Sequence, residues 1–136
     1  MKKRKRVLLI VLGILAAVIA GFVLFLSIGL GLKNAPVKAI DVSKIPDGTY
    51  TGELRGSRFA NRLEATLSGG RIVNIRILND MMVVIPGVSS QVFAAVMEDQ
   101  SLQADSASGA TVTSKAYLKS LENALDSVVL EDGKPL

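Results

Sequence analysis

The clearest chemical potential in the chain lies in a run of small and hydroxyl-bearing residues at positions 105–114, which reads Asp-Ser-Ala-Ser-Gly-Ala-Thr-Val-Thr-Ser. A threonine hydroxyl that must reach a bulky phosphoanhydride needs an open approach. The segment Ser108-Gly109-Ala110 leaves such an approach to Thr111, because it carries little side-chain bulk and Gly109 permits a sharp turn. These residue types therefore suit a site where a threonine hydroxyl meets a phosphate group.

The residues that follow add favourable electrostatics for an anion. A helix that starts near residues 112–114 would point N–H groups and the positive end of its dipole at an anion held by Thr111. Thr113, Ser114 and Lys115 could supply further donors. The alternative is that Thr111 or Thr113 is only an N-cap, since Ser and Thr are favoured there for hydrogen bonding alone.

This segment resembles the flavinylation motif of the FMN-binding domain family, which includes the flavin-carrying subunits of the sodium-pumping NADH:quinone reductase and of the Rnf complex. In that family, FMN is esterified through its phosphate to the threonine that closes an Asp-x-x-Ser/Thr-Gly-Ala-Thr sequence. The matching positions here are Asp105, Ser108, Gly109, Ala110 and Thr111. The resemblance implies FMN as the cofactor and Thr111 as its attachment residue.

The resemblance covers about residues 46 to 130. It includes Asp-Gly-Thr-Tyr-Thr-Gly-Glu at 47–53 and Ser-Gly-Gly-Arg-Ile-Val-Asn-Ile at 68–75, and it resumes at 99–101. It implies that a separate flavin transferase attaches the FMN, and that the domain exchanges electrons with redox partner proteins or a quinone-linked complex. Asp105 either helps the transferase recognise the motif, as the resemblance implies, or begins an Asx-turn.

Residues 7–32 form a stretch of 26 residues without a charged side chain. As a helix with about 1.5 Å of rise per residue, the stretch more than covers a hydrocarbon core of roughly 30 Å. Signal peptides have apolar regions of only about 7 to 15 residues, so an uncleaved transmembrane anchor is predicted. The basic cluster at 2–6 should stay in the cytoplasm, which places residues 33–136 on the extracytoplasmic side of the cell membrane.

The spacing of these features predicts four regions. The segment after the span carries Pro36 and Pro46 with mixed polarity, as expected of a short spacer. We therefore expect a cytoplasmic basic tail at 1–6, a transmembrane anchor at 7–32, a linker at 33–46 and an FMN-binding domain at 47–136.

Composition excludes several other functions. The net charge of +4 comes from the basic tail, because residues 7–136 contain 11 Lys or Arg against 12 Asp or Glu. The five arginines between Arg55 and Arg76 alternate with apolar and acidic residues, which indicates solvated strand faces and no nucleic-acid surface. The chain has neither cysteine nor histidine, which argues against thiolate catalysis, a catalytic triad or a zinc site. Redox work would then need a bound organic cofactor.

The remaining sequence predicts a small α+β domain. Period-two alternation marks strands at 48–56 and 62–67, Gly69-Gly70 is a hairpin signal, and 72–78 has the β-branched content of a returning strand. These strands should form an antiparallel β-meander. Apolar residues at helical spacing predict helices at about 89–98 and 113–129, and one face of the second should pack on the sheet. The fold class is thus α+β, an N-terminal transmembrane helix followed by a small antiparallel β-meander packed with two helices.

Two groups of apolar residues have alternative interpretations. The aromatic side chains would either flank an isoalloxazine ring or fill a small core; these are Tyr50, Phe59, Phe93 and Tyr117. The segment 79–90 departs from the family, because it is short and reads Met-Met-Val-Val-Ile-Pro at 81–86 where polar sequence is expected. Its Met81-Met82 pair either lines a flavin pocket or belongs to a buried fourth strand.

The sequence predicts a single-pass protein of the lipid bilayer whose extracytoplasmic domain carries FMN for electron transfer, more an electron carrier than a stand-alone enzyme. Two alternatives belong to other classes. One is a cofactor-free, membrane-anchored interaction or accessory subunit, in which the motif is only a helix cap. The other is a flavin-dependent reductase that acts directly on a small substrate.

Overall fold

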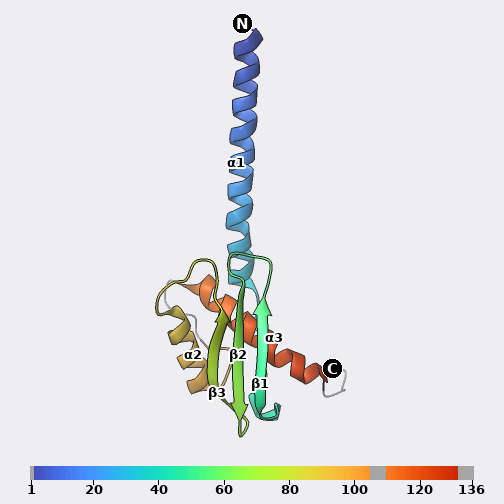
Figure 1. Cartoon of the computed structure of the whole chain (residues 1–136), viewed down its shortest axis with the longest axis vertical. Coiled ribbons are helices and arrows are strands. Elements are labelled where there is room, and N and C mark those ends of the chain that lie inside the picture. Colours follow the sequence, from blue (N-terminus) through green and yellow to red (C-terminus); the bar gives the residue numbers. More distant parts are fainter. Residues whose placement is uncertain (1, 105–109, 132–136) are drawn as a thin grey trace. The chain divides into compact units, whose positions relative to one another are not determined.

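Three strands of alternating sequence form an antiparallel sheet in the order β1-β2-β3 in the computed structural model, which describes residues 2–104 and 110–131 (Figure 1). The strands are β1 (Gly48–Leu54), β2 (Asn61–Ser68) and β3 (Arg71–Asn79). Gly69 and Gly70 join β2 to β3, and both have positive φ, which glycine adopts without a steric penalty. The predicted meander and its hairpin are confirmed.

The two faces of the sheet differ in polarity because β2 alternates strictly. Asn61, Leu63, Ala65 and Leu67 are buried, whereas Arg62 and Ser68 are exposed. On the outer face the Arg76 guanidinium donates to Glu64 at 2.8 Å, across the β2–β3 pair. The inner face holds the core, and the outer face is solvated as the arginine pattern predicted.

Two helices follow the sheet, as predicted. α2 (Val88–Asp99) packs against α3 and β3, and α3 (Thr111–Glu131) packs across β1 and β2 (Figure 1). The buried face of α3 repeats at three- and four-residue intervals, the spacing of one helix face; it comprises Tyr117, Leu118, Leu121, Ala124 and Leu125.

The first 34 residues form a separate compact unit, which consists of helix α1 (Lys2–Asn34). By length and composition, α1 is the one helix of the described residues that is long and apolar enough to cross a membrane. Its apolar side chains are exposed from Val7 to Leu26, as is that of Leu30. This is the pattern of a helix whose apolar surface is not covered by its own chain.

Residues 33–46 were predicted to be a linker, but the chain from Ala35 onward belongs to the globular unit. Val42 in the short helix η1 (Val42–Lys44) and Ile45 after it are buried, with 5% and 4% of their surfaces exposed. The two prolines suggested a spacer, yet the apolar residues between them reach the core. We call residues 35–46 the strap.

Polar contacts fix the strap along α3. The Lys119 ammonium donates to the Pro36 carbonyl at 3.1 Å, and the Lys38 backbone N–H donates to the Glu122 carboxylate at 3.1 Å. Glu122 also accepts from Lys119 at 2.8 Å, and 4% of its surface is exposed. Because a buried carboxylate needs such partners, the strap and α3 depend on one another.

The segment between β3 and α2 contradicts the expectation of a buried fourth strand. Met81 is buried in the core, but the four apolar residues at 82–85 are exposed and form no strand. An apolar run of this length usually indicates a buried element. Here a turn at Pro86 and Gly87 ends the run directly before α2, and Gly87 has a φ of 82°.

Helix α3 approaches the sheet closely at Gly52 in β1. A Cβ atom at this position would overlap the Ser120 carbonyl oxygen and the Ala124 backbone nitrogen, and would lie 2.8 Å from the Ala124 Cα. The obstructing atoms belong to the α3 backbone, which cannot move aside as a flexible side chain would. Glycine at this position therefore sets the distance between helix and sheet.

We predict that Gly52→Ala destabilises the globular unit by more than about 3 kcal/mol, since overpacking against backbone exceeds the usual penalty. Chemical unfolding followed by circular dichroism measures the change. Thr51→Ala is the matched control on the exposed face of the same strand, and it should change the free energy of unfolding by less than about 0.5 kcal/mol. Similar stabilities for both variants would contradict the close approach.

The strap generates a second prediction. A fragment of residues 35–136 should unfold cooperatively, whereas a fragment of residues 47–136 should be less stable by on the order of 3 kcal/mol or more, because it loses two buried aliphatic side chains. Thermal and urea unfolding of both fragments measure the difference. Equal stabilities would show that the strap is only a spacer.

Candidate functional site

The N-terminus of α3 carries the central residue of the predicted site. Ser114 donates its backbone N–H to the Ala110 carbonyl at 2.9 Å, which makes Ala110 the capping position and Thr111 the first helical residue. Neither Thr111 nor Thr113 is therefore the N-cap, and the interpretation of the motif as a simple helix cap does not fit this geometry. The helix begins two residues before the predicted position.

Burial distinguishes the hydroxyl groups of this first turn. Thr111 is half-buried, whereas 4% of the surface of Thr113 is exposed and Ser114 is fully buried. The first amides of an α-helix have no partner within the helix, and they point outward along its axis. Thr111 is thus the least buried of these three hydroxyl-bearing residues, and it lies beside several N–H donors, an arrangement that favours an anion.

The structure places only part of the predicted motif. Ala110, Thr111, Thr113 and Ser114 come together at the start of α3, whereas Asp105, Ser108 and Gly109 lie outside the described residues. Ala110 is buried, with 8% of its surface exposed. Its small side chain lets the chain enter the helix close to the core.

A tyrosine on α3 fixes the helix to the end of β3. The Tyr117 hydroxyl donates to the Asp80 carboxylate at 2.8 Å, and the same carboxylate oxygen accepts from the Met81 backbone N–H at 2.8 Å. Burial, and then the hydrogen bond to Asp80, raise the pKa of Tyr117 well above its usual range. The phenol therefore stays protonated and keeps donating, which holds the N-terminal half of α3 in place.

Sequence reasoning missed Asn61, a buried side chain beside the same half of α3. Its amide nitrogen donates to the Phe59 carbonyl at 3.0 Å and to the Ala116 carbonyl at 3.3 Å. Within the described residues its side-chain oxygen is buried without a hydrogen-bond partner. A buried unpaired acceptor costs about 1–3 kcal/mol, so a donor that reached it would be held well. Asn61 shares the alternating pattern of the buried residues in β2, and this pattern could have predicted that its side chain points into the core.

The structure separates the two interpretations of the aromatic residues. Phe93 and Tyr117 are buried and make an edge-to-face contact with ring centroids 5.5 Å apart, which is core packing. Tyr50 donates to the Pro46 carbonyl at 2.7 Å, at the start of β1. Phe59 is half-buried under the Arg58 guanidinium, 4.8 Å from the ring centroid, two residues before Asn61. Phe59 and Tyr50 thus keep part of their surfaces open, whereas Phe93 and Tyr117 belong to the core.

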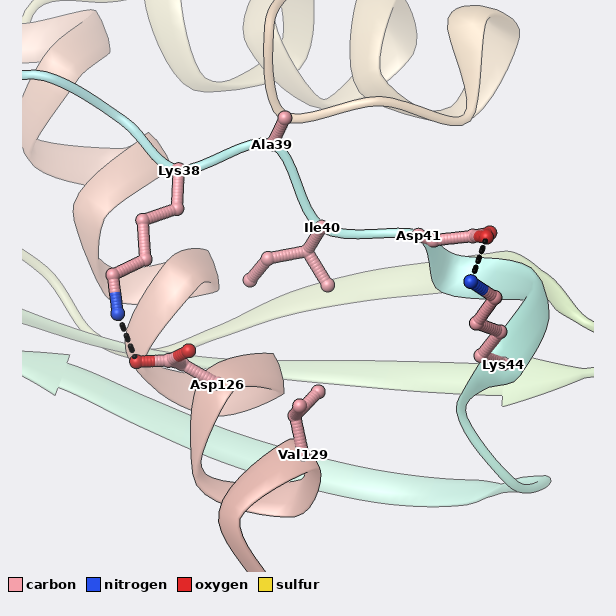
Figure 2. Close-up of a pocket in the computed structure, with 7 residues that line it drawn as sticks. All are labelled: Lys38, Ala39, Ile40, Asp41, Lys44, Asp126 and Val129. Atoms are coloured by element: carbon pink, nitrogen blue, oxygen red, sulfur yellow. Dashed lines mark hydrogen bonds and ion pairs between the residues drawn. The ribbon is translucent and has the colours of Figure 1, made fainter. Parts of the chain in front are cut away.

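A groove elsewhere on the domain, between the strap and the C-terminal half of α3, has a volume of about 360 Å³ (Figure 2). Two ion pairs flank it, Lys38 with Asp126 at 2.9 Å and Lys44 with Asp41 at 3.4 Å, and Ile40 and Val129 lie between them. Asp126 follows Thr111 by 15 residues, which is roughly 22 Å along a helix. This groove is therefore not part of the site at the start of α3, and both of its lysines already have acidic partners.

The fold and the accessible helix terminus define a small α+β domain suited to an anionic cofactor. The sequence model of the FMN-binding domain family matches residues 60–126, from the start of β2 to the C-terminal half of α3. The chain belongs to this family, and FMN is its cofactor. A comparison with curated proteins finds no match.

The residues at this terminus fit the phosphate of FMN. The donor set consists of the Thr111 hydroxyl and the first amides of α3, and the positive end of the helix dipole favours the phosphate charge. Asn61 adds a buried acceptor without a partner in the described part of the chain, which suits a group that carries an N–H donor.

We predict that Tyr117→Phe lowers the free energy of unfolding by about 1.5–3 kcal/mol, the usual contribution of a hydrogen bond to a charged group. Because folding raises the pKa of Tyr117, its contribution is fully present below the unfolded pKa of about 10 and is lost as the pH rises above that value. Urea unfolding of both proteins between pH 7 and 11 tests this. Parallel pH profiles of wild type and variant would show that Tyr117 is not the group responsible.

Proposed function

We propose that the protein is a membrane-anchored flavoprotein whose extracytoplasmic domain carries FMN on Thr111 and passes electrons between redox partners. One observation carries the proposal. In a chain of the FMN-binding domain family, the threonine that ends the predicted motif is the first residue of α3, and it is half-buried where Thr113 and Ser114 are buried.

The attachment is a phosphoryl transfer catalysed by a separate flavin transferase. The Thr111 oxygen attacks the phosphorus of the FMN half of FAD, and a bond forms between this oxygen and phosphorus. The bond from that phosphorus to the bridging oxygen breaks, and AMP leaves with the bonding electrons. The hydroxyl proton passes to a base, so the Thr111 hydroxyl and FAD become phosphoester-linked FMN, AMP and one proton.

The domain's own contribution is to hold the flavin, which supplies the redox chemistry when bound. The α3 amides orient the phosphate, and the Tyr117–Asp80 hydrogen bond keeps this half of the helix in place. A covalent link keeps the local concentration of the cofactor high even where the pocket binds it weakly. This matters for a domain outside the cytoplasm, from which a released cofactor would be diluted.

Anchoring and orientation rest on α1 and on the residues that precede its apolar part. α1 is long and apolar enough to cross a membrane, and Lys2, Lys3, Arg4, Lys5 and Arg6 come before that stretch. Positive charges favour the cytoplasmic side, so the globular unit is on the opposite side. We propose a single-pass protein of the cell membrane with redox partners or a quinone-linked complex at the membrane surface.

The test of the attachment is coexpression with an active flavin transferase. The wild-type protein should keep flavin fluorescence through denaturing electrophoresis and gain the mass of one FMN less one water, measured by mass spectrometry of the intact protein. Thr111→Ala should lose both signals, because it removes the attacking oxygen. Thr111→Ser keeps that oxygen and should be partly labelled.

Thr113→Ala is the matched control, because it removes a hydroxyl of the same turn that is buried. It should retain the label. Equal labelling of wild type and Thr111→Ala would overturn the assignment of this residue. An unlabelled wild-type protein beside a labelled positive control would favour the cofactor-free accessory subunit.

A further inference from the structure

Lys115 is the basic residue that follows Thr111 most closely on α3, four positions further along the helix. Residues at this spacing lie on the same face of a helix, with Cβ atoms about 5–6 Å apart. Long side chains on a helix lean toward its N-terminus and cover the turn that precedes their own Cα atom. The Lys115 ammonium can therefore reach the side chain of Thr111 and a group attached to it.

Burial separates Lys115 from the other two donors that the sequence predicted for this turn. Thr113 and Ser114 are buried, with 4% and 0% of their surfaces exposed, and they offer little surface to a group outside the core. Lys115 is half-buried, like Thr111. Of the three predicted donors, Lys115 is thus the one that shares the partly open surface with Thr111.

Lys115 has no ion-pair partner within residues 2–104 and 110–131. The other described lysines of the globular unit each pair with a carboxylate; the pairs are Lys38 with Asp126, Lys44 with Asp41 and Lys119 with Glu122. The helical neighbours of Lys115 at positions 111, 112, 118 and 119 are Thr, Val, Leu and Lys, so none of them is acidic. Its positive charge is therefore not neutralised by the part of the domain that the structure describes.

The position of this charge is unfavourable in a free helix. The N-terminus of a helix carries the equivalent of about half a positive charge, so it favours acidic side chains and disfavours basic ones. The first turn of α3 nevertheless contains no acidic residue. Lys119 adds a like charge four residues after Lys115, a spacing at which like charges repel. A bound anion would relieve this repulsion, and such a local conflict is expected where a site serves a function.

A phosphate group suits both sets of donors. The first amides of α3 point along the helix axis, and the Lys115 ammonium approaches from the helix face that also carries Thr111. An ammonium group provides three N–H donors and a point charge, and lysine is a common ligand of phosphate in proteins. A phosphate esterified to Thr111 keeps a negative charge, which the amides and the ammonium can share.

We propose that Lys115 is a phosphate ligand of the FMN site and forms an ion pair with the phosphate of the flavin on Thr111. The inference rests on the proposed attachment to Thr111. Charge then holds the phosphate end of the cofactor in addition to the covalent bond. The alternatives are a solvated surface lysine and an ion pair with Asp105, which lies outside the described residues.

The first test compares FMN with riboflavin, which is the same flavin without the phosphate. The full-length protein, produced without flavin transferase and kept in detergent micelles, is titrated into each flavin, and the fluorescence anisotropy of the flavin reports binding. Lys115→Met removes the charge and keeps an unbranched side chain. It should weaken FMN binding by roughly ten-fold, the contribution of a hydrogen bond between charged groups, and leave riboflavin binding unchanged.

Two further variants control this comparison. Lys115→Arg keeps the positive charge and should retain most of the affinity for FMN. Lys44→Met is the matched control, because it removes an exposed lysine of the strap that already pairs with Asp41. It should change the affinity for neither flavin.

The second test uses covalently labelled protein. The bond to the flavin exists in the folded and the unfolded chain, so a change in the urea midpoint on flavinylation reports contacts of the cofactor in the folded state. Flavinylation should raise the midpoint of the wild type and of Lys115→Arg more than that of Lys115→Met. This difference should shrink as the salt concentration rises, because salt screens the ion pair.

The outcomes separate the ion pair from the attachment. An equal ratio of FMN to riboflavin affinity in the wild type and Lys115→Met, or equal shifts of their midpoints, would overturn the ion pair and leave the attachment standing. Equal destabilisation of the unlabelled protein by Lys115→Met and Asp105→Asn would assign the charge to Asp105 and also overturn it. Absence of the covalent label from the wild type would overturn the attachment, and the ion pair at Thr111 with it.

Discussion

The contact between α3 and β1 at Gly52 is the constraint on which the rest of the domain depends. The helix backbone lies so close to the strand that no Cβ fits between them, and this distance lets Leu121, Ala124 and Leu125 reach the inner face of the sheet. The same helix carries Thr111 at its start, the tyrosine that bonds to Asp80 in its first half, and the acidic residue that holds the strap farther on. Its position on the sheet thus sets the position of all three.

Regular elements could be predicted from the sequence because their signals are local. Strict alternation in β2 and the glycine pair after it give the hairpin, and the apolar spacing from Tyr117 to Leu125 gives the buried face of α3. Family resemblance, carried by the motif that ends at Thr111, indicated FMN, which the match over residues 60–126 confirms. The threonine that the motif selects is also less buried than Thr113 and Ser114 in the same turn.

The features that sequence reasoning missed depend on contacts between distant residues. Tyr117 and Asp80 are 37 positions apart, and Lys119 and Pro36 are 83 apart, so neither pair leaves a periodic signal. The strap was mistaken for a spacer because its two prolines outweighed the buried Val42 and Ile45. The apolar run at 82–85 was expected to be buried because hydrophobic runs usually are, and nothing local reveals that only Met81 enters the core.

Both outer strands of the sheet have a backbone group bound by a side-chain amide. The Gln100 amide accepts from the Ile72 N–H at 2.7 Å and donates to the Ile72 carbonyl at 3.0 Å, while the Asn123 amide donates to the Glu53 carbonyl at 2.8 Å. An unpaired strand edge is a template on which another chain can add a strand and begin aggregation. With part of each edge already hydrogen-bonded, a β-strand from a neighbouring molecule would have to displace an intramolecular bond before it could align, so these two amides oppose intermolecular sheet extension.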